Sequence, residues 1–182
     1  MTNPSQEIIE LMRTDPLALG KFIFPHHFRI KSPTFHHTLL ILALENLNLV
    51  VGAPRESSKT TILGFTFLFH QIVFKKKRFV VIITSVYSKS CGILDAIKSE
   101  VKNNDRLKRF FPLEITKDAE GDSIIRHSDG FETRIMCKGR DQIGTIRGEK
   151  FGAYRPARRL SNCKTKKYNK DQINTCFECH TY

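Results

Sequence analysis

Residues 53–61 carry the clearest chemical pattern in this chain, Ala-Pro-Arg-Glu-Ser-Ser-Lys-Thr-Thr. A short apolar run precedes this segment at residues 47–51, and a long apolar run follows it at residues 62–74. A buried strand, a turn, a Lys-Thr pair and a helix in this order are typical of a phosphate-binding loop, in which backbone N–H groups and the helix N-terminus hold phosphate. In such a loop Lys59 binds the β- and γ-phosphates of a nucleotide, and the Thr60 hydroxyl ligates Mg²⁺.

The spacing departs from the usual motif at both of its glycine positions. The usual motif is a glycine, any four residues, a second glycine, a lysine and then serine or threonine. This spacing would place the two glycines at the positions of Ala53 and Ser58, whereas the chain has Gly52 one residue early. Both substitutes are small, so phosphate can still approach the backbone, but a residue with a Cβ resists positive φ. The alternative is a plain strand-to-helix turn with a solvated lysine, and the loop by itself leaves both interpretations open.

The elements that must position this loop are expected to form an α/β fold. Residues 79–85 are β-branched and unbroken, which predicts a central parallel strand, and residues 88–101 have apolar positions at helical spacing. Further elements are predicted as follows: a helix at 5–14 interrupted at 16–20, a helix that starts at Ser32-Pro33, a short helix at 107–111, and a hairpin with Asp129-Gly130 as its turn. Strand and helix in alternation predict a parallel sheet.

Composition limits the class of protein. The chain has 182 residues, enough for one domain with a real core, and a formal net charge of +12 that favours a polyanionic partner such as nucleic acid. Five cysteines without a visible secretory signal argue against a disulfide framework, and we expect a cytoplasmic protein. No apolar run has the roughly 20 residues of a membrane helix, so no membrane partner is expected.

Two histidine pairs, at 26–27 and 36–37, raise the question of a metal site. No carboxylate or cysteine accompanies them at ligand spacing, so packing or surface histidines are the favoured interpretation. The charge run at residues 75–78 is interpreted as a solvated helix end. Residues 138–156 contain five basic residues and four glycines, which suits either phosphate contacts or a structural loop.

Three segments together resemble the large terminase subunit of tailed phages, the ATPase and nuclease that packages DNA. They are residues 24–36 (Phe-Pro-His-His-Phe-Arg to Ser-Pro-Thr-Phe-His), residues 53–61 with their Ala-Pro-Arg start, and residues 144–156 (Gly-Thr-Ile-Arg-Gly to Gly-Ala-Tyr-Arg-Pro). The resemblance covers about residues 20–156, and the third segment is the most specific.

This resemblance implies a P-loop ATPase domain with a parallel sheet and flanking helices, located in the bacterial host cytoplasm. It implies ATP and Mg²⁺ as cofactors, Arg55 as a catalytic arginine near the γ-phosphate, and Thr60 as the metal ligand. The cofactor-binding residues would be Ala53, Pro54, Ser57, Ser58, Lys59, Thr60 and Thr61. The implied partners are double-stranded DNA, the portal and the small terminase subunit, while roles for Arg147 and Arg155 stay open.

The family pattern ends after Pro156. There the family has an aspartate, an apolar strand and an acidic pair, whereas residues 157–182 contain six basic residues, two separate acidic residues and few aliphatic ones. We therefore expect a partial ATPase domain at residues 1–156 and a basic, disordered tail at 157–182, with hydrolysis and nuclease activity lost. A frameshift after Pro156 is one hypothesis, since codon degeneracy lets part of the missing strand be read in another frame.

Other interpretations remain. The tail matches a haem-attachment pattern at residues 176–180 and offers Cys163, Cys176, Cys179 and His180 as zinc ligands, but no surrounding sequence predicts a folded site. A helicase-like P-loop ATPase would use the same loop. A non-enzymatic basic protein would bind nucleic acid without needing Lys59.

Overall fold

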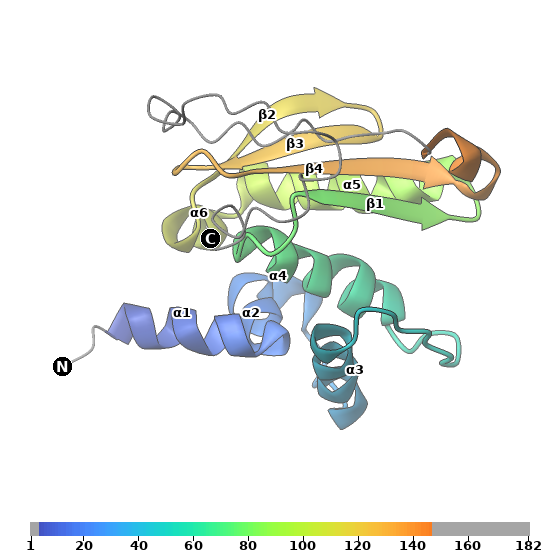
Figure 1. Ribbon diagram of the computed structural model, residues 1–182. Helices are drawn as coiled ribbons and strands as arrows, with labels where there is room; N and C mark the ends of the chain where they lie inside the picture. The colour runs from blue at the N-terminus through green and yellow to red at the C-terminus, as the bar shows by residue number, and fades with distance from the viewer. Residues whose placement is uncertain (1–3, 147–182) are drawn as a thin grey trace, which may run out of the picture. The chain divides into compact units, whose positions relative to one another are not determined.

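The computed structural model describes residues 4–146, with helices alone in the first half of this range and all four strands, together with further helices, in the second (Figure 1). The first half contains α1 (Pro4–Thr14), α2 (Pro16–Ile23), the 3₁₀ turn η1 (Pro25–His27), α3 (Thr34–Glu45), the π-helix η2 (Thr60–Phe67) and α4 (Leu68–Val73). The second half contains β1 (Phe79–Thr84), α5 (Tyr87–Asn103), α6 (Asp105–Phe110), β2 (Leu113–Ala119), β3 (Asp122–His127), β4 (Glu132–Gly139) and the 3₁₀ segment η3 (Arg140–Ile146).

The predicted interruption at residues 16–20 is wrong, because this segment begins a second helix. The Asp15 carboxylate accepts a hydrogen bond from the Leu17 N–H at 2.8 Å and so caps α2, and Pro16 is in its first turn. Proline is tolerated there because the first N–H groups of a helix have no intrahelical acceptor. The helices predicted around residues 5–14, from Ser32-Pro33 and at 88–101 are confirmed.

The apolar run at residues 62–74 is a helix, as predicted, and it is buried along most of its length. It is continuous from η2 into α4, and every residue of α4 is buried. The first half is wound as a π-helix, in which the Thr66 hydroxyl donates to the Thr61 carbonyl at 2.9 Å. Short π segments within helices are often found at functional sites.

The sheet is mixed, which corrects the prediction of a parallel sheet. Its strand order is β1-β4-β3-β2; β1 and β4 run parallel, and the other two pairs are antiparallel. The hairpin is confirmed: Gly130 has φ +86°, a value that favours glycine, and its N–H donates to the His127 carbonyl at 2.9 Å. Strand β2 was not predicted, and β1 has β4 as its one strand neighbour within residues 4–146, so it is not central.

The buried strand predicted at residues 47–51 is also wrong. The segment has no strand geometry, and the side chains of Leu47 and Val50 are 94% and 98% exposed. A strand needs a neighbour that accepts and donates its backbone hydrogen bonds. Among the described residues no strand lies beside this segment, so its apolar pattern alone does not make it part of a sheet.

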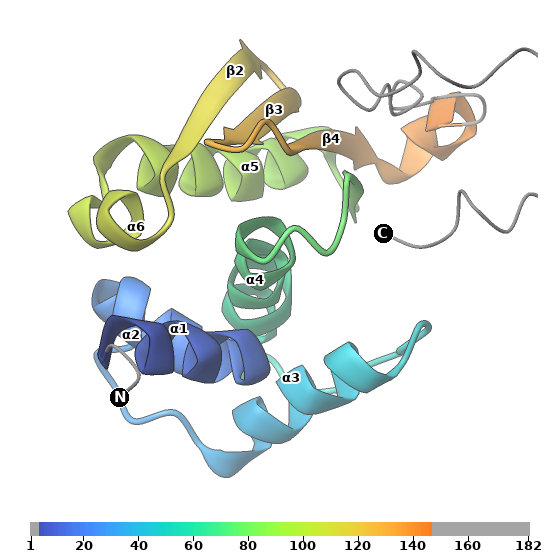
Figure 2. The ribbon, with the colours of Figure 1, turned by 60° about the vertical axis from the view of Figure 1, so that its left-hand side comes forward.

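One hydrophobic core joins the helices to the sheet. Helix α5 packs on β1, β2 and β4, and Figure 2 shows it against the strands with α4 farther from them. The Phe69 ring lies at the centre of the helical part, 4.6 Å from the Phe24 ring and 5.0 Å from the Phe65 ring between centroids. His127 of β3 contributes a polar link, with Nε2 2.9 Å from the Ile72 carbonyl.

The described residues belong to one compact unit that spans residues 1–151. The predicted tail at 157–182, its possible zinc ligands, and Arg147 and Arg155 lie outside the described residues. No helix among residues 4–146 is both long enough and apolar enough to cross a membrane.

Candidate functional site

The loop predicted to bind phosphate connects the irregular segment after α3 to the start of η2. Its turn is closed internally by the Ser57 hydroxyl, which donates to the Pro54 carbonyl at 2.8 Å. It is tied to α3 by His36, whose Nε2 lies 3.1 Å from the Ser57 carbonyl. Because a carbonyl oxygen only accepts, Nε2 of His36 carries the proton in this contact. Helix α3 therefore positions the loop from outside it.

The backbone of the loop has positive φ at two residues that are not glycine, a conformation that residues with a Cβ disfavour. Among the non-glycine residues of the described chain, only Glu56, Ser58 and Lys75 have positive φ, and the first two lie in this loop at +66° and +54°. Ser58 occupies the position where the usual motif has its second glycine. The left-handed conformation costs a residue with a Cβ about 1 kcal/mol. The turn is thus kept although serine is less suited to it than glycine.

Lys59 folds back into the loop that precedes it. Its ammonium group donates to the carbonyls of Ala53 and Pro54, at 2.6 and 2.5 Å, and lies 3.1 Å from the Ser57 hydroxyl. Three acceptors match the three protons of an ammonium group. The lysine is therefore directed toward the interior of the turn, and its charge is held by neutral oxygen atoms that a more strongly accepting anion could replace.

Helix η2, whose N-cap residue is Lys59, presents its N-terminus to the same turn. The first α-type bond runs from the Ile62 N–H to the Ser58 carbonyl, at 2.9 Å. The amide groups that precede such a bond have no intrahelical acceptor, and they carry the positive end of the helix dipole. Thr60 is exposed in the first turn, and Thr61 is half-buried. Backbone N–H donors, the Lys59 ammonium group and the Thr60 hydroxyl thus occur within residues 59–61.

A cavity of about 780 Å³ lies beside the loop. One wall is the loop itself, residues 52–58 with Thr61 and Ile62, and the other is the segment from His26 to His36. Arg29, Lys31 and Arg55 contribute positive charge to its lining. Cavities of a few hundred to about 1,000 Å³ are the usual size for a small-molecule ligand. The space is large enough for a nucleotide.

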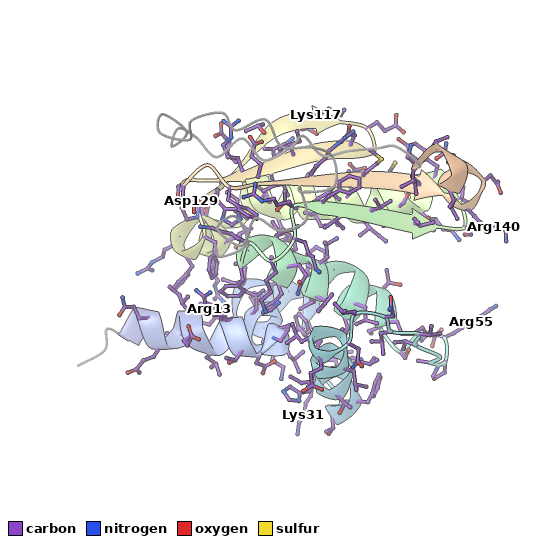
Figure 3. The ribbon with its side chains drawn as sticks, viewed as in Figure 1. Arg13, Lys31, Arg55, Lys117, Asp129 and Arg140 are labelled. Atoms are coloured by element: carbon purple, nitrogen blue, oxygen red, sulfur yellow. The ribbon has the colours of Figure 1, made fainter. Side chains whose placement is uncertain are left out.

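Arg55, predicted to be catalytic, lies at the exposed tip of the loop (Figure 3). The remaining predicted residues are brought together as one turn: Ala53, Pro54 and Ser57 contact the Lys59 ammonium, Ser58 supplies the positive φ, and Thr60 and Thr61 begin the helix. All of them are close in sequence, so this grouping follows from the segment itself.

Two contributions were missed by sequence reasoning. His36 is buried, with 6% of its surface exposed, and its Nδ1 has no hydrogen-bond partner among the described residues. The predicted packing role fits His36, but no sequence signal indicated its bond to the loop. The second missed residue is Glu100, which contacts both His26 and His27 although it lies 74 positions after His26. A carboxylate therefore does accompany this histidine pair in space, although none lies near the pair in the sequence.

Comparisons with protein-family models, with curated proteins and with solved structures find no match to this chain.

Proposed function

We propose that residues 53–61 form a phosphate-binding loop that binds ATP with Mg²⁺, in a nucleotide-binding module of the terminase large-subunit type. The observation that carries this proposal is the Lys59 ammonium group held by the Ala53 and Pro54 carbonyls inside the turn. Phosphate oxygens accept charge-assisted hydrogen bonds more strongly than neutral carbonyls do. The oxygen atoms of a bound polyphosphate would therefore replace these carbonyls as hydrogen-bond acceptors of the Lys59 ammonium group.

The surrounding groups support the same ligand. The N-terminus of a helix favours an anion, and the arginine and lysine side chains of the cavity wall add positive charge. Thr60 is exposed at the position where the motif places its Mg²⁺ ligand. In this proposal Lys59 binds the terminal phosphates, Thr60 holds the metal, and Arg55 reaches the γ-phosphate from the exposed tip of the loop.

Hydrolysis is expected to be slow. Phosphoryl transfer depends on positioned groups that orient the attacking water and hold the metal. The resemblance would place two adjacent acidic residues after Pro156, and residues 157–182 contain only the separated Asp171 and Glu178. Loss of such a catalytic group lowers the rate by orders of magnitude. We therefore propose a chain that binds nucleotide and turns it over poorly.

Double-stranded DNA is the proposed macromolecular partner, with portal and small terminase subunit by the same resemblance. The net charge of +12 supports a polyanion. The basic run at residues 75–78 is partly engaged within the fold, since Lys75 pairs with Asp129 and the Arg78 guanidinium lies 4.4 Å from the centre of the Phe131 ring. These contacts agree with its interpretation as a helix end, so other basic side chains would have to contact DNA.

The test is a titration of the purified chain with a fluorescent ATP analogue and Mg²⁺. We expect saturable binding that inorganic triphosphate displaces, and at least a tenfold loss of affinity in Lys59→Ala. Lys108→Ala is the matched control, because Lys108 is exposed on α6 and its removal changes the net charge equally. Equal binding by all three proteins would contradict the proposal, and it would favour a basic protein that attracts anions nonspecifically.

A further inference from the structure

A cluster of two histidines and a glutamate contains no residue of the phosphate-binding loop. His26 and His27 are consecutive residues of η1, and Glu100 belongs to α5. The Nε2 atom of His26 lies 2.6 Å from Oε1 of Glu100, and the Nε2 atom of His27 lies 3.4 Å from the same oxygen. The three atoms that could act as ligands lie within 4.8 Å of one another. We call these residues the His-His-Glu cluster.

Neighbouring contacts hold the cluster in place. The second carboxylate oxygen of Glu100, Oε2, accepts a hydrogen bond from the Asn104 side-chain amide at 2.7 Å. Asn104 is fixed in turn, because its amide also lies 2.9 Å from the Ile23 carbonyl. The His27 ring packs on Phe65, with 4.7 Å between centroids. Orientation of ligating groups by such outer contacts is a general property of metal sites in proteins.

Burial differs across the cluster in a way that suits an ion. The Glu100 side chain is 12% exposed, whereas the side chains of His26 and His27 are 46% and 34% exposed. A carboxylate with so little access to water is stabilised by a positive charge beside it. The partly exposed imidazoles leave a path by which an ion and its remaining water ligands can enter.

We propose that the His-His-Glu cluster binds a divalent transition-metal ion, with zinc as the best fit. Two imidazole nitrogens and one carboxylate oxygen are ligands that Zn²⁺ accepts at about 2.0–2.2 Å, whereas Mg²⁺ and Ca²⁺ prefer oxygen alone. Tetrahedral geometry at these distances separates ligand atoms by roughly 3.3 Å. The His27 contact of 3.4 Å already matches this value, and His26 must move outward by roughly 0.7 Å.

Three protein ligands leave a fourth position for water or an exogenous ligand, the arrangement of a site that is open to chemistry. Both histidines also line the cavity beside the phosphate-binding loop. A bound ion would therefore add positive charge to the wall of that cavity. None of its three ligands belongs to residues 53–61, so metal binding can be tested without nucleotide.

The test is a titration of the full chain with Co²⁺, followed by visible absorption, with Zn²⁺ used to displace the cobalt. Cobalt is chosen because thiolate ligands give it intense near-ultraviolet charge-transfer bands, which a site of nitrogen and oxygen ligands lacks. This separates the His-His-Glu cluster from the tail residues Cys163, Cys176 and Cys179. We expect visible bands of a low-coordinate ion without the thiolate bands, and unchanged binding when the three cysteines are replaced by serine.

Substitutions identify the ligands. His26→Ala, His27→Ala and Glu100→Gln should each weaken Co²⁺ binding at least tenfold, whereas His37→Ala, which removes an exposed histidine of α3, should leave it unchanged. Circular dichroism checks that each variant is folded, and Glu100→Gln keeps the size of the side chain and its contact with Asn104. Binding that persists in all three cluster variants, that depends on the tail cysteines, or that is absent from the folded chain would overturn the proposal.

Discussion

His70 is expected to make the stability of the fold depend on pH in the mildly acidic range. Its side chain is fully buried in α4, and its Nε2–H donates to the Arg13 carbonyl at 2.9 Å, which joins the end of α1 to the helical core. Its Nδ1 lies 3.2 Å from the Gln71 side-chain amide nitrogen, so it acts as an acceptor. Burial lowers the pKa of His70 from 6.5 to about 4, with a smaller contribution in the same direction from Lys76.

The sign and size of the effect follow from this shift. The unfolded chain takes up a proton at His70 near pH 6.5, whereas the folded chain takes it up only near pH 4. The contribution of His70 to the free energy of unfolding is therefore fully present above pH 6.5, decreases as the pH falls from 6.5 to 4, and is lost below pH 4. At 1.36 kcal/mol per pKa unit, the loss is about 3 kcal/mol, a large part of the 5–15 kcal/mol typical of a domain.

The assay is urea unfolding at a series of pH values between 4 and 8, on the wild-type chain and on His70→Gln. Glutamine can place an amide N–H near the position of Nε2, and it does not titrate. We expect the free energy of unfolding of His70→Gln to fall by about 3 kcal/mol less than that of the wild type between pH 7 and 4.

Some dependence on pH should remain in the variant, because burial also lowers the pKa of His127. His37→Gln, at an exposed position, is the matched control and should behave as the wild type. Parallel curves for the wild type and His70→Gln across this range would refute the argument, and they would mean that the protonated imidazole finds an acceptor in the folded state.

Three further predictions concern the sheet, the core and the loop. Asp122 receives two hydrogen bonds from Arg134, at 2.9 and 2.8 Å, and these with Lys117 lower the pKa of Asp122 from 3.8 to about 2. Asp122→Asn should therefore lower the free energy of unfolding, measured with urea at pH 7, by about 2 kcal/mol. The wild type should lose this contribution as the pH falls from 3.8 to 2. Phe69→Ala removes a fully buried ring and should destabilise the fold by about 3–5 kcal/mol, whereas an unchanged urea midpoint would mean that Phe69 is not in the core. Ser58→Gly relieves the positive φ of +54°, which the loop has without any ligand, and should raise the free energy of unfolding by about 1 kcal/mol in the urea assay; a lower free energy of unfolding would show that the serine side chain stabilises the turn.

Local patterns determined much of the secondary structure. The helix at residues 88–101 and the hairpin at Asp129-Gly130 were predicted correctly, because helical spacing and a glycine with positive φ act over a few residues. The grouping of Lys59 with Ala53 and Pro54 was equally local, since a six-residue separation is closed by one turn. The α/β class is confirmed on this basis.

Only the tertiary structure decided the features that depend on distant neighbours. Apolar residues at 47–51 predicted a strand, yet a strand exists only where another strand satisfies its backbone hydrogen bonds, and the described residues place none there. The parallel sheet was wrong for the same reason. Strand β4 does lie parallel to β1, but β3 and β2 continue the sheet from β4 with antiparallel pairs. Sequence spacing likewise excluded a carboxylate beside His26, whereas the packing of η1 on α5 brings Glu100 within 2.6 Å of it. Contacts of this kind are set by how the chain folds back on itself, and residue patterns along the sequence do not contain that information.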